Sequence, residues 1–341
     1  MAAFARRWTT PVPIYFDPNF TVEESNKIRA AIHHIEANTC ISFREQSTIN
    51  YAVPIWRNGS CSAKALGMML PSKYYYHLSI SLNPDAPANC LETIGVAEHE
   101  LFHLLGMIHT IERSDAVDYV TVNTENLQEE QLWQFRPGTE MRNFTPYDYS
   151  SIMHYGSHLS RNSSSINPLI PTLVAKNDMY QYTMGNQKEA TYYDLHDLNM
   201  NNKCYGKPAQ CGGFLHADER QKIEGLWIGN STKKKSFEYS YCVYWIMTHR
   251  DDRFIEMVID GITEGGSHNH SIQEQASCRI YGIEIKSALD PRIGGQVFCG
   301  KPALEKRFVS QSNILPVILF SREGYQAYSI TYKSVRAPKA P

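Results

Sequence analysis

Apolar residues in the first part of the chain follow the periods of helices and of short strands. Residues 21–39 carry isoleucines spaced four and three positions apart, at Ile28, Ile32 and Ile35. This spacing places them on one face of a helix, and Thr21 ahead of an acidic first turn is typical of a helix N-terminus. Strand-like runs follow at residues 50–55 and 75–82, before a second apolar helix expected over residues 91–105. Strands and helices combined in this way predict an α+β fold.

The pattern changes after Cys204, where alternation with a period of two replaces the helical period. Apolar and aromatic side chains occupy every second position of two stretches: Phe237, Tyr239, Tyr241, Val243 and Trp245, then Tyr328, Ile330 and Tyr332. Such alternation is typical of half-buried antiparallel strands. A short linker is expected at residues 206–210. We therefore predict two domains, at residues 1–205 and 211–333, the second of them strand-rich.

Composition narrows the classes of function that the chain can serve. The 341 residues carry 33 Lys and Arg against 35 Asp and Glu, a formal net charge of −2. A balance so close to neutral gives no argument for binding to nucleic acid or to an anionic membrane. No apolar run approaches the ~20 residues that cross a bilayer, so no transmembrane segment is expected.

The cysteines indicate an oxidising compartment. Eight is an even count, and their spacing is not that of a zinc knuckle, so disulfides and a secreted, extracellular protein are expected. Six Asn-x-Ser/Thr sequons agree with a glycoprotein: Asn19, Asn58, Asn143, Asn162, Asn230 and Asn269. Residues 1–8 lack the apolar segment of a signal peptide, so the chain is expected to approximate a mature form or a truncated gene model. A cytosolic protein is the alternative.

A metal-binding motif, H-E-x-x-H-x-x-G-x-x-H, begins at His99. On a helix, His99 and His103 lie one turn apart and can reach the same metal ion. Gly106 can reverse the chain at the helix end, because glycine enters the left-handed region without steric cost, and the reversal would bring in His109 as third ligand. Three ligands leave one coordination position open for water, which is typical of catalytic zinc. Glu100 is placed to act as the base that takes a proton from this water. The alternative is a set of structural histidines on a partly buried helix.

A second motif, Y-D-Y-S-S-I-M-H-Y, occupies residues 147–155. Together the two motifs resemble the astacin family of metzincin endopeptidases, in which S-x-M-H-Y is the methionine turn beneath the metal. Further similarity covers about 200 residues: Trp8 with residues 13–15 looks like the opening strand, residues 38–43 like N-T-C-I-x-F, residues 113–126 like the stretch after the third ligand, and residues 194–204 like the closing helix. The resemblance implies a metzincin or zincin-like catalytic domain, with a twisted sheet and a zinc helix.

The resemblance also implies roles for the residues of both motifs. Three histidines would bind one zinc ion: His99, His103 and His109. Glu100 would act as general base and then as general acid. Met153 would form the apolar floor under the metal, and Tyr155 would be a switchable fifth ligand whose hydroxyl supports the oxyanion. On chemistry alone, Met153 and Tyr155 could equally be core residues, and His154 between them is expected to point away from the metal.

Three places depart from the pattern of the family. Thr110 stands where a glutamate usually follows the third histidine and holds the mature N-terminus, and Glu112 lies two residues further on. Ala116 and Val117 replace the usual Arg-Asp. Residues 70–73 lie near the place of the missing Gly-Gly-x-Gln of the substrate-facing edge strand. These departures concern N-terminal anchoring and subsite shape, and they remove neither a metal ligand nor the base.

The second half resembles a CUB domain, a β-sandwich that often follows astacin catalytic domains. The resemblance rests on residues 211–213, 278–286 and 294–300, and the combination looks most like nematode secreted astacins. Some CUB domains bind calcium through an aspartate where this chain has Tyr281, so calcium binding is not expected. By the same analogy four disulfides are expected: Cys40–Cys204 and Cys61–Cys90 in the first domain, then Cys211–Cys242 and Cys278–Cys299 in the second.

The resemblance therefore implies a secreted zinc metalloendopeptidase that hydrolyses internal peptide bonds of extracellular proteins. Its partners would be protein or peptide substrates, with a further protein bound by the CUB domain. One alternative is a catalytically inactive protease-like protein that acts as a CUB-mediated binding module, and Thr110 is the one feature that favours it. Another is a thermolysin-like enzyme with a distant glutamate ligand, which is disfavoured because His109 already supplies the third ligand.

Overall fold

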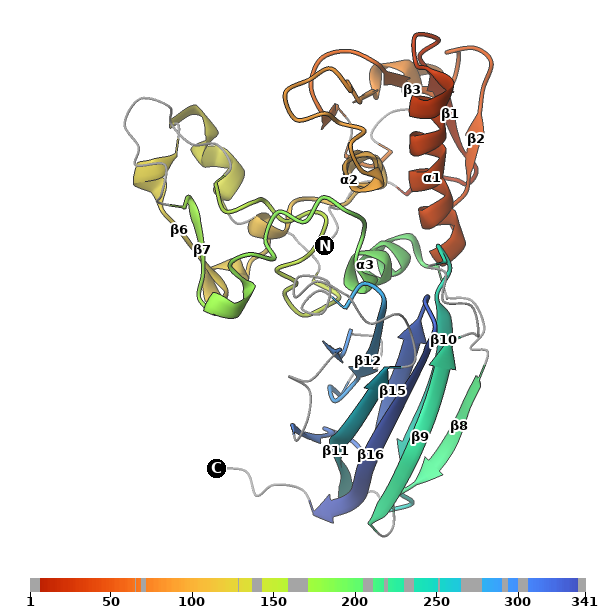
Figure 1. The fold of residues 1–341 in the computed structure, drawn as a ribbon, viewed down its shortest axis with the longest axis vertical. Helices are drawn as coiled ribbons and strands as arrows, with labels where there is room; N and C mark the ends of the chain where they lie inside the picture. The colour runs from red at the N-terminus through yellow and green to blue at the C-terminus, as the bar shows by residue number, and fades with distance from the viewer. Residues whose placement is uncertain are drawn as a thin grey trace. The chain divides into compact units, whose positions relative to one another are not determined.

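The computed structural model divides the chain into two compact units, Met1–Gly206 and Lys207–Pro341, shown as a ribbon in Figure 1. It describes residues 7–64, 66–68, 72–127, 129–136, 143–158, 171–204, 211–217, 220–229, 236–250, 252–264, 278–289, 294–299 and 306–336. The linker predicted at residues 206–210 lies outside the described residues. None of the helices that the structure describes is long and apolar enough to span a membrane.

A five-stranded sheet forms one layer of the first unit (Figure 1). Its described strands are β1 (Val12–Phe16), β2 (Phe43–Glu45), β3 (Val53–Trp56), β4 (Ser62–Ala63) and β5 (Ile80–Ser81), in the order β2-β1-β3-β5-β4. The pairs β1–β2, β1–β3 and β3–β5 are parallel, and β4 runs antiparallel to β5 at the edge. The antiparallel edge strand β4 is short, and β5 lies between it and β3.

Two of the α-helices that the structure describes pack against each other beside this sheet. They are α1 (Val22–Asn38) and α2 (Ile94–Leu104), and α3 (Tyr192–Asn202) follows much later in the chain. The helix predicted at residues 21–39 is confirmed, with Thr21 and Glu24 forming a reciprocal capping box at its N-terminus. Its isoleucine stripe is buried: Ile28, Ile32 and Ile35.

The remaining described elements of the first unit are short. They are the two-stranded sheet β6 (Val120–Val122) with β7 (Leu173–Ala175), and the 3-10 helices η1 (Ser72–His77), η2 (Thr110–Glu112), η3 (Ala116–Asp118), η4 (Thr124–Asn126), η5 (Glu129–Phe135) and η6 (Asp178–Tyr180). A separate apolar cluster, which includes Leu127, Phe135 and Tyr147, lies among these segments. Much of the described part of the unit after α2 is thus held by side-chain packing and hydrogen bonds rather than by long regular elements.

The strand predicted at residues 75–82 is wrong over its first half. Tyr75 belongs to η1, and its carbonyl accepts a turn hydrogen bond from the Leu78 N–H at 2.9 Å. The Tyr75 ring packs edge-on against Trp8, with centroids 4.7 Å apart. An aromatic run favours a strand by propensity, but this long-range ring contact and the local turn override the preference.

The described residues of the second unit form two facing β-sheets. One has the order β13-β12-β15-β10-β8 and the other β14-β11-β16-β9. The strands are β8 (Cys211–His216), β9 (Gln221–Gly229), β10 (Ser240–Met247), β11 (Arg253–Glu264), β12 (Tyr281–Ile285), β13 (Gln296–Phe298), β14 (Arg307–Val309), β15 (Ile314–Ser321) and β16 (Tyr325–Arg336). All pairs are antiparallel except β8 with β10. Residues of both sheets share one apolar core, which confirms the predicted β-sandwich and the α+β class.

The two alternating stretches of this unit behave differently. In β16, Tyr328 and Ile330 face the shared core, as the period predicts. In β10, the core-facing residues are Cys242 and Ile246, whereas Trp245 lies on the other face and is 37% exposed. The period alone therefore locates both strands but does not identify which face of β10 is buried.

Four disulfides lie in the described part of the chain, and they join the same pairs that the resemblance implies. Cys40–Cys204 and Cys61–Cys90 lie in the first unit, and Cys211–Cys242 and Cys278–Cys299 lie in the second. The first of them links residues 164 positions apart, just beyond the C-terminal ends of α1 and α3.

Candidate metal centre

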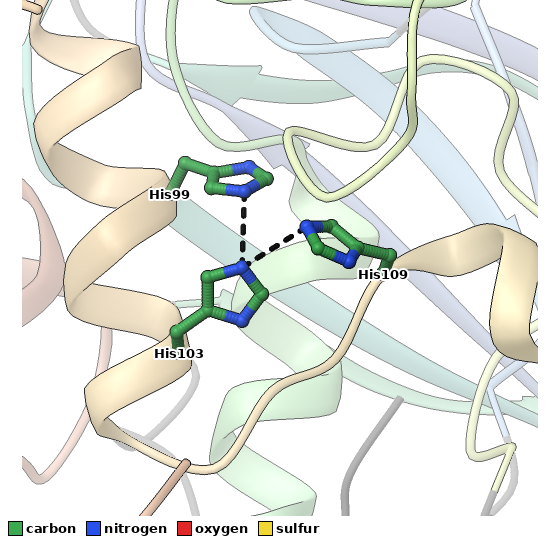
Figure 2. Close-up of side chains that lie close together, drawn as sticks. All are labelled: His99, His103 and His109. Atoms are coloured by element: carbon green, nitrogen blue, oxygen red, sulfur yellow. Dashed lines mark hydrogen bonds between the residues drawn. The ribbon is translucent and has the colours of Figure 1, made fainter. Parts of the chain in front are cut away.

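Helix α2 presents two of the three motif histidines on one face, as Figure 2 shows. The helix ends at Leu104, and Gly106 then takes a φ of +94°. In this left-handed conformation the Gly106 N–H donates to the His103 carbonyl at 3.0 Å. The reversal leads the chain back to His109, which approaches from outside the helix (Figure 2).

The imidazole rings of the three histidines converge on one point. The Nε2 atom of His103 lies 3.1 Å from Nε2 of His99 and 3.1 Å from Nε2 of His109, the contacts dashed in Figure 2. Among the described residues, these three form the one group of His, Cys, Asp or Glu side chains that could share a metal ion. The motif thus assembles three nitrogen donors at a single place.

In His99 and His103, the second ring nitrogen fixes which nitrogen faces the common point. Nδ1 of His99 lies 2.7 Å from the Ile152 carbonyl, and Nδ1 of His103 lies 2.8 Å from the Met107 carbonyl. A carbonyl can only accept, so both Nδ1–H groups donate and both Nε2 lone pairs face inward. Burial lowers the pKa of all three histidines, which favours the neutral form that binds metals.

Glu100 follows the first histidine and is buried, with 5% of its surface exposed. Its Oε2 atom is buried and has no hydrogen-bond partner among the described residues. Burial raises the pKa of Glu100 to about 8. A buried carboxylate oxygen without a partner among the described residues, next in sequence to a candidate metal ligand, fits a site completed by a cation and water.

The methionine of the second motif lies in a tight turn, in which the His154 N–H donates to the Ser151 carbonyl at 3.0 Å. Met153 is 2% exposed, and its carbonyl accepts from the Thr110 N–H at 2.9 Å. His154 is engaged elsewhere, because its ring nitrogens contact the Tyr147 hydroxyl at 2.8 Å and the Tyr155 carbonyl at 2.7 Å. Burial lowers the pKa of His154 to about 4. His154 therefore stays outside the metal group.

Asp194 of α3 holds this turn in place. Its carboxylate accepts from the Ile152 N–H at 2.8 Å, from the Thr191 N–H at 2.9 Å and from the Ser151 hydroxyl. Burial, reinforced by the neighbouring Asp148, raises the pKa of Asp194 to about 7. Because the Ile152 carbonyl orients His99, Asp194 acts on a candidate metal ligand through the turn. The Thr191-x-x-Asp194 capping box is visible in the sequence, but its contact with the turn is not.

Tyr155 ends the second motif and packs directly against His109. Their ring centroids are 4.2 Å apart, and the Tyr155 hydroxyl lies 2.8 Å from Nδ1 of His109. The same hydroxyl contacts Oε1 of Gln134 at 3.0 Å. Burial, together with the carboxylates of Glu112 and Glu100, raises the pKa of Tyr155, so its hydroxyl stays protonated. No pattern in the sequence pointed to Gln134.

The positions that depart from the family pattern have different surroundings. Thr110 is buried and lines a small polar cavity with three aspartates, Asp148, Asp194 and Asp197. Glu112 accepts from the His109 N–H at 3.1 Å, and its Oε2 lies 3.4 Å from Nδ1 of His109. Val117 is exposed. Residues 70 and 71 lie outside the described residues, and residues 72 and 73 begin η1.

The donor set fits zinc. Three neutral imidazole nitrogens with a remaining position for water are the ligands of catalytic zinc sites. The side chains that would hold the metal are His99, His103 and His109.

Comparison with known proteins gives matches to both units. The family model described as astacin, a family of peptidases, matches residues 1–204. Zinc metalloproteinase nas-31 of Caenorhabditis elegans is 25% identical, over 96% of this chain but 56% of its own length, so the chain spans little more than half of that relative. The high choriolytic enzyme 1, a hatching enzyme zinc-protease of medaka fish (Oryzias latipes), is 24% identical over 59% of this chain and 94% of its own, with a TM-score of 0.49. The CUB1-EGF-CUB2 region of human MASP-1/3 is 18% identical over 39% of this chain and 44% of its own, with a TM-score of 0.26.

Proposed function

The chain belongs to the astacin family of peptidases, and from this membership we propose that it is a zinc-dependent endopeptidase that hydrolyses internal peptide bonds. One observation carries the proposal. Three imidazole Nε2 atoms converge, and the next residue after the first of them is a buried glutamate with an oxygen that has no partner among the described residues. Such an arrangement supplies metal ligands and a base within one site.

Zinc is the cofactor of this site. When bound, it lowers the pKa of a coordinated water toward neutrality and polarises the substrate carbonyl. His99, His103 and His109 would hold it. The carbonyls of Ile152 and Met107 accept hydrogen bonds from the first two rings, so they fix the ring orientation and raise the basicity of the ligating nitrogens.

Glu100 is the proposed general base and general acid. Its carboxylate accepts the proton that the attacking water loses and then passes it to the leaving amine. Burial raises the pKa of Glu100 to about 8 in the metal-free chain, and a positive charge beside it would lower that value toward neutrality. A pKa near the working pH serves both directions of proton transfer.

Tyr155 is the proposed donor to the oxyanion of the tetrahedral intermediate. Its hydroxyl lies beside the third histidine, and its raised pKa keeps the proton in place at neutral pH. A protonated phenol can donate a hydrogen bond to the oxygen where negative charge develops. Met153, which is buried, is the proposed apolar floor under the metal.

We further propose a secreted protein that acts on extracellular proteins. Four disulfides in the described residues are compatible with an oxidising compartment. The proposed domains are residues 1–205, which carry the peptidase, and residues 211–333, which form a CUB-like domain that binds a further protein.

The test is cleavage of a quenched peptide library by the purified full chain. We expect cleavage within the peptides, loss of activity with a chelator, and recovery when zinc is added back. The variant Glu100→Ala should keep zinc and lose turnover by about 10²- to 10⁴-fold. The exposed Glu125 provides a matched control, and Glu125→Ala should cleave like the wild type.

The same experiment separates the peptidase from a protease-like binding module. One zinc ion per chain without any cleavage would support the inactive protein, in which Thr110 in place of the family's glutamate leaves the cleft misformed. Full activity in Glu100→Ala would refute the assigned base.

A further inference from the structure

Glu112 approaches the third histidine at two of its atoms. One carboxylate oxygen, Oε2, accepts a hydrogen bond from the His109 backbone N–H at 3.1 Å and lies 3.4 Å from the ring nitrogen Nδ1. Glu112 belongs to the short helix η2 and follows His109 by three positions. The turn therefore brings this carboxylate back onto both the backbone and the ring of His109.

The second ring nitrogen of His109 has surroundings that differ from those of the other two histidines. Nδ1 of His99 and Nδ1 of His103 each face a backbone carbonyl, at 2.7 and 2.8 Å. Nδ1 of His109 faces two side chains instead, the Tyr155 hydroxyl at 2.8 Å and the Glu112 carboxylate. His109 also lies beyond the end of α2, so the helical period does not orient its ring. The orientation of this candidate ligand therefore depends on side chains.

A metal bound through Nε2 requires the ring hydrogen to lie on Nδ1. Nε2 of His109 faces Nε2 of His103 at 3.1 Å, so that hydrogen points toward the two side chains. The Tyr155 oxygen is the nearer acceptor, but as a switchable ligand it would leave this place whenever its hydroxyl turns to the metal. The carboxylate of Glu112 can only accept when ionised, and its bond to the His109 N–H keeps it beside the ring. Glu112 thus offers Nδ1 an acceptor in either position of Tyr155.

The place left by the family's glutamate is a different one. Thr110, which stands at that position, lines the small polar cavity that Asp148, Asp194 and Asp197 also line. Glu112 is not among the described residues that line this cavity, and its Oε2 is engaged with His109. This separation argues against Glu112 as a substitute for the glutamate that Thr110 replaces.

We propose that Glu112 is a positioning residue that holds His109 with its hydrogen on Nδ1 and its Nε2 lone pair toward the metal. This inference rests on the proposed function, in which His109 binds zinc. A carboxylate beside the outer nitrogen of a ligating imidazole restricts the orientation of the ring and raises the basicity of the inner nitrogen.

The test is the zinc affinity of the full chain, measured by competition with a chromogenic chelator. Glu112→Ala should raise the Kd for zinc about 10- to 100-fold. Glu112→Gln keeps the length and an acceptor oxygen but loses the charge, so its Kd should lie between those of the wild type and Glu112→Ala. If Glu112→Ala does not fold, Glu112→Gln decides by the same criterion. The exposed Glu125 of η4 gives the control Glu125→Ala, which should bind zinc like the wild type.

Substitution of Tyr155 separates the two neighbours of Nδ1. In a Tyr155→Phe background the carboxylate remains and the hydroxyl is gone, so adding Glu112→Ala should again weaken zinc binding. A second readout uses the metal-free full chain with isotope-labelled histidine. The His109 resonances, assigned with His109→Ala, should report a hydrogen on Nδ1 in Tyr155→Phe and a shift toward Nε2 when Glu112→Ala is added. Glu125→Ala in the same background should leave them unchanged.

Each outcome decides for or against this role. An unchanged zinc affinity in Glu112→Ala would overturn it even if the free energy of unfolding falls, because that combination indicates a purely structural role. A loss of affinity that vanishes in the Tyr155→Phe background, or an unchanged His109 resonance, would also overturn it. If zinc affinity responds as expected but no form cleaves any peptide, the proposed function fails and the support of the ligand stands. If the wild type cleaves peptides and the affinity does not respond, the inference fails alone.

Discussion

The two halves of the metal centre are held by different kinds of interaction. Helix α2 places His99 and His103 through its own backbone period, with their Nε2 atoms 3.1 Å apart. The turn that carries Met153 and Tyr155 has no repeating backbone, and Asp194, 42 positions away from Ile152, holds it by hydrogen bonds. Local spacing therefore specifies the helix half, and contacts between distant segments specify the turn half.

This difference indicates where substitutions should act. A change in the helix half should remove a metal ligand directly and affect activity more than stability. A substitution in α3, far from the second motif in sequence, should disturb the turn half because α3 holds the turn by hydrogen bonds. Such a substitution should lower stability and activity together.

The largest expected effect is on the helix half. His99→Ala removes one of three nitrogen donors, so zinc content should fall well below one ion per chain and peptide cleavage should fall to background. Elemental analysis and a peptide assay measure the two quantities. The exposed His33 on α1 gives the control His33→Ala, which should retain both. A fully loaded and active His99→Ala would show that the helix half does not bind the metal.

The next effect tests how α3 is tied to the rest of the first unit. Cys40→Ser with Cys204→Ser opens a link across 164 positions, which the chain-entropy model values at about 5 kcal/mol. Hydrogen exchange of the first unit should increase accordingly. Cys278→Ser with Cys299→Ser opens a link across 21 positions in the second unit, worth about 3 kcal/mol in the same model, and should leave exchange in the first unit unchanged. Equal exchange of the first unit in both double variants would contradict the expected difference.

Asp194 tests the turn half directly. Asp194→Ala removes the acceptor for the Ile152 N–H and the Ser151 hydroxyl, so the free energy of unfolding should fall by about 1–3 kcal/mol. Because the Ile152 carbonyl orients His99, kcat/KM should fall about 10- to 100-fold. Denaturant titration and the peptide assay measure these changes. Unchanged kcat/KM would show that the turn does not position the ligand.

The pH dependence of stability sharpens the same point. Burial raises the pKa of Asp194 to about 7, and burial also raises the pKa of Asp148. At these two carboxyl groups the folded chain binds more protons than the unfolded chain between about pH 4 and pH 7, so their contribution to the free energy of unfolding should fall as pH rises through that window. In Asp194→Asn this fall should shrink. Urea midpoints of the metal-free chain across the window measure it, and an unaltered slope would contradict the assignment.

The smallest effect lies on α1, away from the site. Hydrogen bonding and charge from Arg57 lower the pKa of Glu24 to about 2, so its stabilisation is present above about pH 4 and is lost as pH falls toward 2. Glu24→Gln should cost about 1 kcal/mol at neutral pH with unchanged kcat/KM. Glu23→Gln, in the same helical turn but exposed, should cost less. A larger loss in Glu23→Gln would reverse the expected order.

The sequence could predict what depends on neighbours in the chain. The spacing of His99, His103 and His109 predicted that their side chains meet at one place. The Thr21 cap and the isoleucine stripe predicted the position of α1. Family resemblance supplied the disulfide pairs, because residues as distant as Cys40 and Cys204 leave no local signal.

The rest depends on contacts that no local pattern records. Tyr75 lies in a 3-10 helix, and its ring packs on Trp8, a residue 67 positions away in the sequence. The buried face of β10 is decided by the opposing sheet, and period two is the same for both faces. Gln134 and Asp194 reach the site from other segments, so their contacts follow only from the fold.

The Cys40–Cys204 link has a consequence for how the first unit responds to cutting by another protease. A single break of the backbone anywhere between these two cysteines leaves both fragments covalently joined. A nicked chain would therefore migrate as one band on a gel until a reductant separates the pieces. Damage of this kind would be invisible to any assay of size carried out without reduction.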